Sequence, residues 1–356
     1  MTSKLHTRQT GLTLIELMIS VVLGLLLVTG LITIFTGNNQ TYRVTEAHSR
    51  LQDNARFALD VLSKNVRTAG FSGCRPIEHM EVLIIANDLL DKEMLPETII
   101  HGNEATGANW SPNISTDLDD VIEGTDVITI QHGISCGASL TESISNTDAD
   151  ISIFAHSCGF KINDTAMIAD CTDAHIFKVT DVSSATGIEH AIADTTQNPK
   201  VIGNITPHFC TSDASDAAGN CLDDKLYNYD AELFKFAFTS YFIRLGAGGS
   251  PSLWKFEHTS NRAFELIEGI EDMQIVYGLD TNNDDTVDSY ENAQTVENLS
   301  QWDQVVSARI SLLAQTLENN LTTSDQIVSY NGAPVTGDGK LRRVFSSTIT
   351  IRNRVQ

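Results

Sequence analysis

Glu16 has the most unusual setting of any residue in this sequence. It is the only charged side chain in an otherwise apolar run over residues 12–36. A carboxylate in lipid costs roughly 2.5–3.5 kcal/mol even on the mild insertion scale, so such a residue indicates a function and requires a cationic partner. Cleavage after Gly11 would create that partner, because Leu12 would then carry an α-ammonium. The ammonium of one subunit could neutralise the Glu16 carboxylate of its neighbour while both are buried.

A second group of oxygen-bearing side chains lies over residues 280–291. This stretch matches a twelve-residue calcium loop, which takes its ligands from positions 1, 3, 5, 7, 9 and 12. Asp285 stands at the sixth position, where glycine normally permits a sharp turn, although Asp tolerates the left-handed conformation. The alternative is an acidic, solvated turn before a helix that begins near Glu291. The six calcium ligands would be Asp280, Asn282, Asp284, the carbonyl of Thr286, Asp288 and Glu291.

Six cysteines follow the apolar run: Cys74, Cys136, Cys158, Cys171, Cys210 and Cys221. In an exported body an even number of cysteines predicts disulfides, and none of the spacings is typical of a zinc site. Six cysteines allow fifteen pairings. Short loops favour Cys158–Cys171 and Cys210–Cys221, which leaves Cys74–Cys136.

Composition argues against several function classes. The net charge is −23, and so acidic a surface disfavours direct binding to nucleic acid or to anionic lipid heads. The one basic cluster is near the C-terminus, where alternating outward positions on a last strand explain it best: Arg342, Arg343, Arg352 and Arg354. The sequence contains no Gly-x-Ser-x-Gly, His-Glu-x-x-His or phosphate-loop motif, so we predict no enzymatic activity.

The N-terminal run allows two simpler interpretations. A secretory signal peptide needs an apolar core of 7–15 residues and a small-residue cleavage site, but this run is longer and residues 36–40 offer no such site. An ordinary single-pass anchor fits the length but gives no reason for Glu16 or Gly11. Lys4 and Arg8 precede the run, so the positive-inside rule predicts a cytoplasmic N-terminus and an exported body.

The helix is predicted to continue well beyond the membrane. Apolar residues recur at steps of three and four, which is the pattern of an amphipathic helix. Gly70 and Gly73 would end it. The predicted helix over 12–69 is about 87 Å long at 1.5 Å per residue. Its exported stripe comprises Val44, Ala47, Leu51, Ala55, Ala58, Leu62, Val66 and Ala69.

Beyond Cys74 the sequence consists of short β-rich runs between turn residues. Residues 246–251, rich in glycine, predict a hairpin connection. One long helix packed on an antiparallel sheet is an α+β fold. The predicted strands are 126–131, 176–182, 234–244, 252–258, 270–279, 305–315 and 343–352. The predicted divisions are a leader (1–11), an anchor (12–36), an exported helix (37–70) and a β-rich domain (71–356), which holds a variable, disulfide-containing region (75–230) before the C-terminal strands (231–356).

Two sets of residues resemble a known family. Gly11-Leu-Thr-Leu-Ile-Glu-Leu-Met-Ile-Ser20 resembles the class III signal of type IV pilins, although Leu12 stands where many pilins have Phe. Five further blocks resemble PilW-type minor pilins in their expected order, and residues 75–230 are not covered. These blocks are Asn54–Asp60, Arg67–Cys74, Gly269–Asp280, Trp302 with Val305–Leu313, and Arg343–Asn353.

The resemblance implies a pilin-like fold and a role in assembly. A prepilin peptidase would cut after Gly11 and methylate the Leu12 amine. The inner-membrane subunit would then join other minor and major pilins, initiate a type IV pilus and occupy its tip, where a tip adhesin would be a further partner. One alternative is a minor pseudopilin of type II secretion, which uses the same signal. Another is an adhesin or ligand-binding module formed by residues 75–230.

Overall fold

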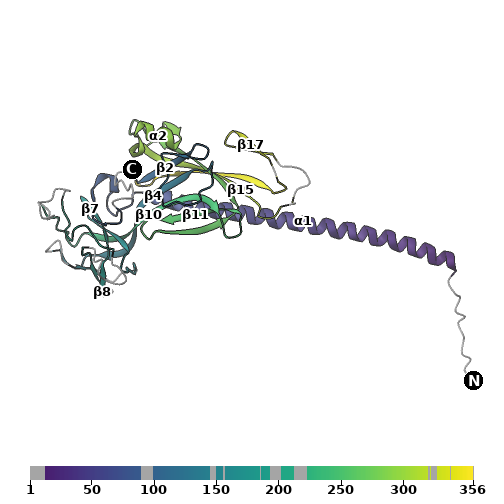
Figure 1. Cartoon of the computed structure of the whole chain (residues 1–356), viewed down its shortest axis with the longest axis horizontal. Coiled ribbons are helices and arrows are strands. Elements are labelled where there is room, and N and C mark those ends of the chain that lie inside the picture. The colour runs from purple at the N-terminus through teal and green to yellow at the C-terminus, as the bar shows by residue number, and fades with distance from the viewer. Residues whose placement is uncertain are drawn as a thin grey trace, which may run out of the picture.

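The computed structural model describes residues 13–89, 99–144, 150–154, 157–184, 186–192, 202–211, 223–319, 321, 327–336 and 338–355. Helix α1 (Leu14–Thr68) extends far beyond a β-rich body, against which only its C-terminal part packs (Figure 1). The predicted α+β architecture is therefore confirmed.

The C-terminal part of α1 packs with the stripe that the sequence predicts. Ala47, Leu51, Ala55, Ala58, Leu62 and Val66 are the buried residues of the helix. Val44 is half-buried, and Ala69 is buried just beyond the helix. Gly70 follows with a φ of +72°, and a Cβ there would lie 2.8 Å from the side chain of Ile99. Both the left-handed backbone and the close packing therefore require glycine where the helix ends.

The larger of two main sheets has nine strands in the order β1-β7-β6-β10-β4-β2-β3, and β11 and β12 extend it from β10. All its neighbouring strands are antiparallel except β1 and β7. The strands are β1 (Glu81–Ile84), β2 (Ile100–Ala105), β3 (Trp110–Ser111), β4 (Val127–Ser139), β6 (Thr165–Ala169), β7 (Asp173–Lys178), β10 (Glu232–Leu245), β11 (Pro251–Glu257) and β12 (Arg262–Glu268).

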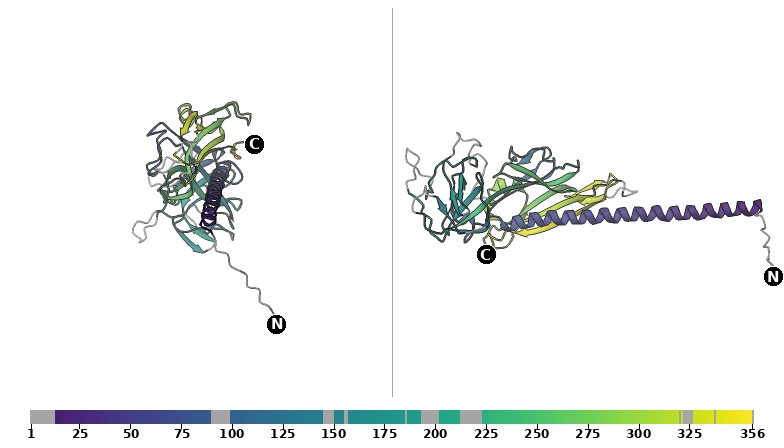
Figure 2. Two further views of the ribbon diagram at one scale, coloured as in Figure 1. Left: turned by 90° about the vertical axis from the view of Figure 1, so that its right-hand side faces the viewer. Right: turned by 90° about the horizontal axis from the view of Figure 1, so that it is seen from below.

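The second sheet has the order β14-β13-β15-β18 and is antiparallel throughout. Its strands are β13 (Ile270–Leu279), β14 (Ser289–Glu291), β15 (Val305–Gln315) and β18 (Arg342–Thr350). The yellow C-terminal strand lies along α1 (Figure 2). The Arg352 amide donates to the carbonyl of Arg67, and the Asn353 side chain donates to that of Ala69, so the C-terminus is tied to the helix end.

Smaller elements complete the body. They are β5 (Ile151–Ser152), β8 (Asp181–Ser184), β9 (Gly187–Glu189), β16 (Ile327–Tyr330), β17 (Ala333–Thr336), α2 (Ala293–Leu299), η1 (Ile77–His79) and η2 (Trp302–Gln304). Helix α2 begins after its N-cap residue Asn292, close to the helix start that the sequence predicts near Glu291.

The body contains two large cores. The main core joins the α1 stripe to the inner faces of both sheets. A second core includes Phe177, Phe209 and Tyr227 and lies among β5–β9 and the adjoining ends of β4 and β10. We call this part the distal lobe, because Figure 1 shows β7 and β8 at the end of the molecule opposite the N-terminus.

The strand predictions are confirmed where the alternation of apolar residues is long. The predicted strands at 270–279 and 305–315 match β13 and β15, and residues 246–251 connect β10 and β11 as a hairpin. The predicted strand at 176–182 is wrong, because β7 ends at Lys178 and β8 begins at Asp181. Short or polar strands such as β2 and β12 were not predicted, since their sequences lack a clear alternation.

Two of the predicted disulfide pairings are wrong. The structure joins Cys74 to Cys171 and Cys136 to Cys158. The chain that leaves α1 returns as β1 beside β7, with Glu81 donating to the Thr172 carbonyl, and this brings Cys74 to the turn before β7. Strand pairing, rather than loop length, therefore decides the partners.

The structure describes only one of the remaining two cysteines, so the pair Cys210–Cys221 stays a prediction. Cys210 is in a disulfide, while its predicted partner Cys221 lies outside the described residues. None of the cysteines that the structure describes is free. These disulfides agree with the oxidation that the sequence predicts for the body.

Candidate functional site

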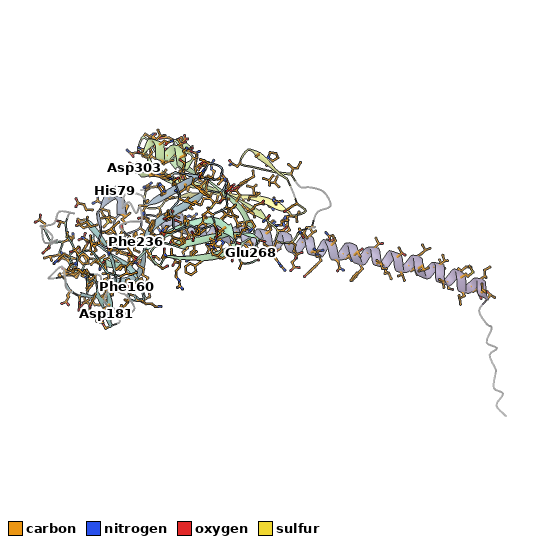
Figure 3. All side chains as sticks on the ribbon, in the orientation of Figure 1. His79, Phe160, Asp181, Phe236, Glu268 and Asp303 are labelled. Atoms are coloured by element: carbon orange, nitrogen blue, oxygen red, sulfur yellow. A yellow bond between two sulfur atoms is a disulfide. The ribbon has the colours of Figure 1, made fainter. Side chains whose placement is uncertain are left out.

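The N-terminal part of α1 is an apolar surface without a protein partner in the single chain. Leu14 is 78% exposed and Phe35 66%, and the large hydrophobic side chains between them are similarly exposed. They project from the helix on all sides (Figure 3). The helix is long and apolar enough to cross a membrane. Because so large an exposed apolar surface is unfavourable in water, lipid or other helices must cover it.

Glu16 lies at the start of this surface and folds back on the helix N-terminus. Its carboxylate accepts hydrogen bonds from the backbone N–H and the hydroxyl of Thr13, both at 3.0 Å, while the Thr13 hydroxyl accepts from the Glu16 N–H at 3.4 Å. This is a capping box, and it offsets part of the cost of the carboxylate within a single subunit. The sequence prediction missed Thr13, although Thr-x-x-Glu before an apolar run is its signature. Gly11 and Leu12 lie outside the described residues.

The loop proposed for calcium is curled around Asp280. This buried carboxylate accepts the backbone N–H groups of Asn282, Asp284 and Asp285, at 3.3, 3.2 and 2.8 Å. Asp285 has a φ of +64°, the conformation that glycine normally takes at the sixth position of a calcium loop. The unusual residue at this position is thus compatible with the required backbone.

The other proposed calcium ligands are only partly convergent. Asp288 accepts from the backbone and hydroxyl of Thr281 at 2.8 and 2.6 Å, and Thr286 donates to Asp284. Glu291 lies on β14, paired with Tyr277. Among the residues that the structure describes, no three acidic, histidine or cysteine side chains form a group that could hold a metal ion. The calcium site therefore stays a prediction.

The outward row that the sequence suggests is confirmed for Arg343 and Arg352, which are exposed, and is wrong for Arg342 and Arg354. Arg342 is buried and forms ion pairs with Glu271 at 2.6 Å and Asp338 at 3.0 Å. Arg354 donates to the carbonyl of Val305 at 2.7 Å. Both of these guanidinium groups are therefore used within the body, whereas Arg343 and Arg352 are exposed.

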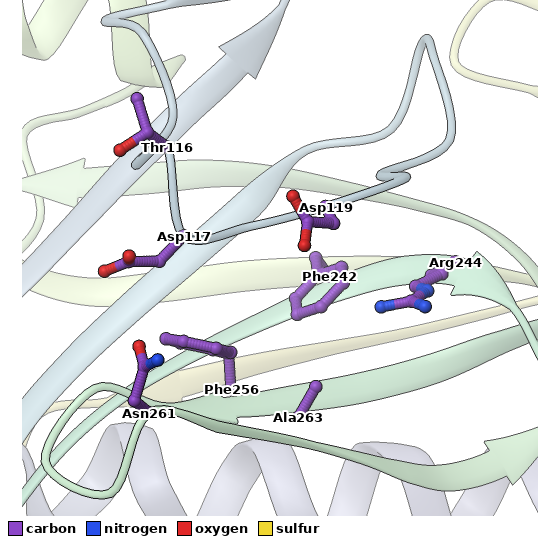
Figure 4. A pocket seen from close by; sticks show the side chains of 8 residues that line it. All are labelled: Thr116, Asp117, Asp119, Phe242, Arg244, Phe256, Asn261 and Ala263. Carbon is purple, nitrogen blue, oxygen red and sulfur yellow. The ribbon is translucent and has the colours of Figure 1, made fainter.

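Two cavities lie on opposite faces of the β10–β11–β12 strands. The loop-side cavity, of about 350 Å³, is floored by Phe242 and Phe256 and rimmed by Asp117, Asp119 and Arg244 (Figure 4). The helix-side cavity, of about 410 Å³, opens next to α1 and is lined by side chains from β4, β6, β10, β11 and β12. Neither cavity was predicted, because each combines strands that are distant in the sequence.

A buried carboxylate joins the two main sheets. Asp126 accepts a hydrogen bond from Ala105 of β2 at 2.9 Å and from Ile275 of β13 at 2.8 Å. Burial raises the pKa of Asp126 to about 7, and the nearby carboxylate of Glu104 adds to the rise. This group is therefore partly protonated near neutral pH while it connects the sheets.

Comparison with known proteins covers both ends of the chain. Residues 240–353, from within β10 to just beyond β18, match the family model of the type IV pilus-assembly protein W. Residues 6–32 match the prokaryotic N-terminal methylation motif and include Gly11, Leu12, Thr13 and Glu16. No curated protein and no solved structure matches the chain. The chain is thus similar to the type IV pilus-assembly protein W over its last third and to the prokaryotic N-terminal methylation motif at its start.

Proposed function

We propose that the protein is a minor pilin that takes part in initiating a type IV pilus and remains at or near its tip. Its role is structural rather than enzymatic: its apolar helix leaves the lipid and bundles with the helices of neighbouring subunits. The observation that carries the proposal is α1 itself, in which a fully exposed apolar half continues without a break into a half packed in the body.

A rigid helix of this kind suits a subunit that moves from membrane to fibre. In lipid the exposed half is covered by acyl chains, and in a filament it would be covered by other helices. The capping box would satisfy Glu16 before assembly, and the Leu12 ammonium of a neighbouring subunit would replace Thr13 as its partner afterwards. Since a charge pair forms only in one axial position, this exchange would also set the register between subunits.

The distal lobe supports a place at the tip. It lies beyond the C-terminal end of α1 and holds a core of its own. A subunit that carries such a mass above its helix leaves little room for another subunit to stack upon it. The match over 240–353 favours a pilus over a type II secretion fibre.

The proposal includes a processing step and an orientation. The N-terminus would be cytoplasmic and the body periplasmic, then extracellular in the assembled pilus, in agreement with Lys4 and Arg8 before the span. A prepilin peptidase would remove residues 1–11 and methylate Leu12.

Gly11 provides the test of processing. A Gly11→Val variant should remain in the membrane as the full-length precursor. The wild-type protein should lack residues 1–11 and carry one added methyl group. Gly24→Val is a matched control, because a Cβ at Gly24 meets no atom within 4 Å and this glycine is remote from the cut. Intact mass spectrometry of membrane-extracted protein distinguishes these forms. A wild-type protein that still begins at Met1, or that is cut after Phe35, would contradict the proposal.

A further inference from the structure

The unpaired lysine and arginine side chains of this acidic protein gather along one side of the body. Many other basic side chains are used within the chain, as Lys225 is in its ion pair with Asp170 at 2.7 Å. Over the described parts of the chain, the exposed basic side chains with neither a hydrogen bond nor an ion pair are Lys161, Arg262 and six on or next to α1 and β18. We call these six the basic seam: Arg56, Lys64, Arg67, Arg75, Arg343 and Arg352.

Helix α1 supplies one half of the basic seam. Arg56, Lys64 and Arg67 follow one another at steps that keep them on the same side of the helix, opposite the stripe that packs in the main core. Asp53 and Asp60 share this side, but neither has an ion-pair partner among the described residues. The free side of the helix therefore keeps an excess of positive charge.

Strand β18 supplies the other half. It is the edge strand of the second sheet and lies along α1 (Figure 2). Arg343 and Arg352 are exposed at its two ends, and no acidic residue occurs between them. The backbone N–H of Arg352 donates to the carbonyl of Arg67 at 3.2 Å, so the strand and helix parts of the seam are continuous. Arg75 lies in the segment that follows the helix end.

An exposed aromatic side chain lies within the basic seam. Phe57 is 46% exposed on the same side of α1 as Arg56 and Asp60, although phenylalanine is among the residues most often buried. Aromatic residues and arginine are the types most enriched at protein interfaces and among the residues that dominate binding energy. The seam therefore has the composition of an interface.

The height of the basic seam excludes lipid as its partner. Arg56 lies about 30 Å along the helix beyond Phe35, at 1.5 Å per residue, so the seam is clear of the head groups when the apolar half is in a membrane. Duplex DNA is a poor partner, because the net charge of −23 repels its phosphates. When the apolar halves of two subunits lie side by side, the surface next to this part of α1 is the body of the neighbour.

We infer that the basic seam binds a carboxylate-rich face of the neighbouring pilin subunit, with Phe57 as the apolar anchor of the contact. The inference rests on the proposed function, since bundling of the apolar halves brings the neighbour alongside. It adds the chemistry of the partner: Asp and Glu side chains opposite the seam and an apolar pocket for Phe57. Complementary charges of this kind favour the correct partner and fix its register.

Photo-cross-linking in cells that assemble pili tests the contact. A Phe57→p-benzoylphenylalanine subunit should, on irradiation, form an adduct with another subunit that carries the N-terminal methylation signal. Mass spectrometry of the adduct should place the cross-link in a peptide rich in Asp and Glu. Phe154→p-benzoylphenylalanine is the matched control, because Phe154 is 58% exposed but belongs to the distal lobe, and it should give no such adduct.

Charge reversal then tests the basic seam itself. The double variant Arg56→Glu/Arg352→Glu should lower both the Phe57 cross-link and incorporation into sheared pili about tenfold or more. Arg56→Lys/Arg352→Lys keeps the charge and should retain both. Arg262→Glu is the control, an exposed and unpaired arginine outside the seam. All of these variants should keep the melting temperature in nanodiscs within a few degrees, because their side chains have no partner in the body.

Three results would overturn the inference. They are a Phe57 cross-link to no pilin subunit, a cross-linked peptide without acidic residues, and a double Glu variant that cross-links and is incorporated normally. Retention of duplex DNA by the wild-type protein in nanodiscs, lost in the same variant, would also overturn it in favour of phosphate. In each case a wild-type subunit that is found in pili leaves the proposed function intact, whereas its absence from pili would contradict that function instead.

Discussion

The two halves of α1 are one continuous helix with opposite surroundings. In the first half the large apolar side chains from Leu14 to Phe35 are exposed, whereas in the second half Ala55, Ala58 and Leu62 are completely buried against the two sheets. The same secondary structure thus serves two purposes, because the body supplies partners for only one half. In the proposed function the first half depends on lipid and on other subunits, whereas the second half depends on the core of its own chain.

This contrast separates assembly from folding. Changes in the first half should alter incorporation into pili and leave the melting temperature of the body unchanged, and changes in the buried stripe of the second half should do the reverse. Each of the following predictions tests one side of that separation.

The largest effect is expected for Glu16→Ala. Removing the carboxylate eliminates its cost in lipid, so insertion should be normal, but the subunit loses its charge partner for a neighbouring Leu12 ammonium. We expect incorporation into pili to fall about tenfold or more, with no change in the melting temperature. Immunoblots of sheared pili measure incorporation.

Ser20→Ala is the control for Glu16→Ala. Ser20 donates only to the Glu16 carbonyl within the helix, at 2.7 Å, so its loss should leave assembly intact. Normal incorporation of Glu16→Ala subunits would contradict the role in assembly that we propose for the Glu16 carboxylate.

A pair of leucines compares the halves directly. Leu62 is fully buried in the main core, so Leu62→Ala should lower the free energy of unfolding by about 2–5 kcal/mol. Leu26 is 66% exposed, so Leu26→Ala should leave the free energy of unfolding unchanged. Thermal and urea unfolding of the full chain in nanodiscs measure both. Equal effects of the two substitutions would show that the halves are not independent.

Calcium at residues 280–291 should produce a smaller stabilisation of the body. A site with a dissociation constant near 10⁻⁴ M would be worth about 1.4 kcal/mol at a tenfold excess of the ion. We expect a higher melting temperature in calcium than in chelator, and no such effect of magnesium. Glu291→Gln is the best variant for this test and should abolish the rise in melting temperature. Asp280 is less suitable, because it also holds the loop by accepting three backbone N–H groups without metal.

The control for the calcium site is Asp303→Asn, an exposed carboxylate outside the loop that should keep the full response. Equal melting temperatures in calcium and chelator would leave only the hydrogen-bonded acidic turn.

The smallest effect is a pH dependence that arises from Asp126. Its pKa of about 7 in the folded protein lies above the ordinary value, so its contribution to stability is complete at low pH and is lost as the pH rises through 7. Burial lowers the pKa of His132 and His175 to about 4, and these groups act in the opposite direction below about pH 6.5.

The useful window for this test is therefore pH 6.5–8. The free energy of unfolding should decrease by about 1 kcal/mol or less from pH 6.5 to 8. Asp126→Asn should flatten this slope, as measured by urea unfolding, and an unchanged slope would contradict the assignment.

Local patterns determined much of this molecule. The apolar run with Glu16, the stripe from Ala47 to Val66 and the alternation in β13 and β15 each depend on residues that are close in the sequence. The spacing at which apolar residues recur indicates which side of a helix or strand must be buried, whatever covers that side. The sequence therefore predicted the helix, its exposed and buried halves, and the longest strands. The sequence also contains the capping-box pattern of Thr13 and Glu16, which the sequence prediction missed.

Only the tertiary structure decided how distant segments meet. The order β1-β7-β6-β10-β4 paired Cys74 with Cys171, placed Asp126 between two sheets and brought His132 to the same cavity as Thr165. Such contacts depend on which strands become neighbours, and strand order follows from burying the whole core at once rather than from any local period. For that reason the helix could be predicted from the sequence, but the disulfides, the buried carboxylate and the cavity could not.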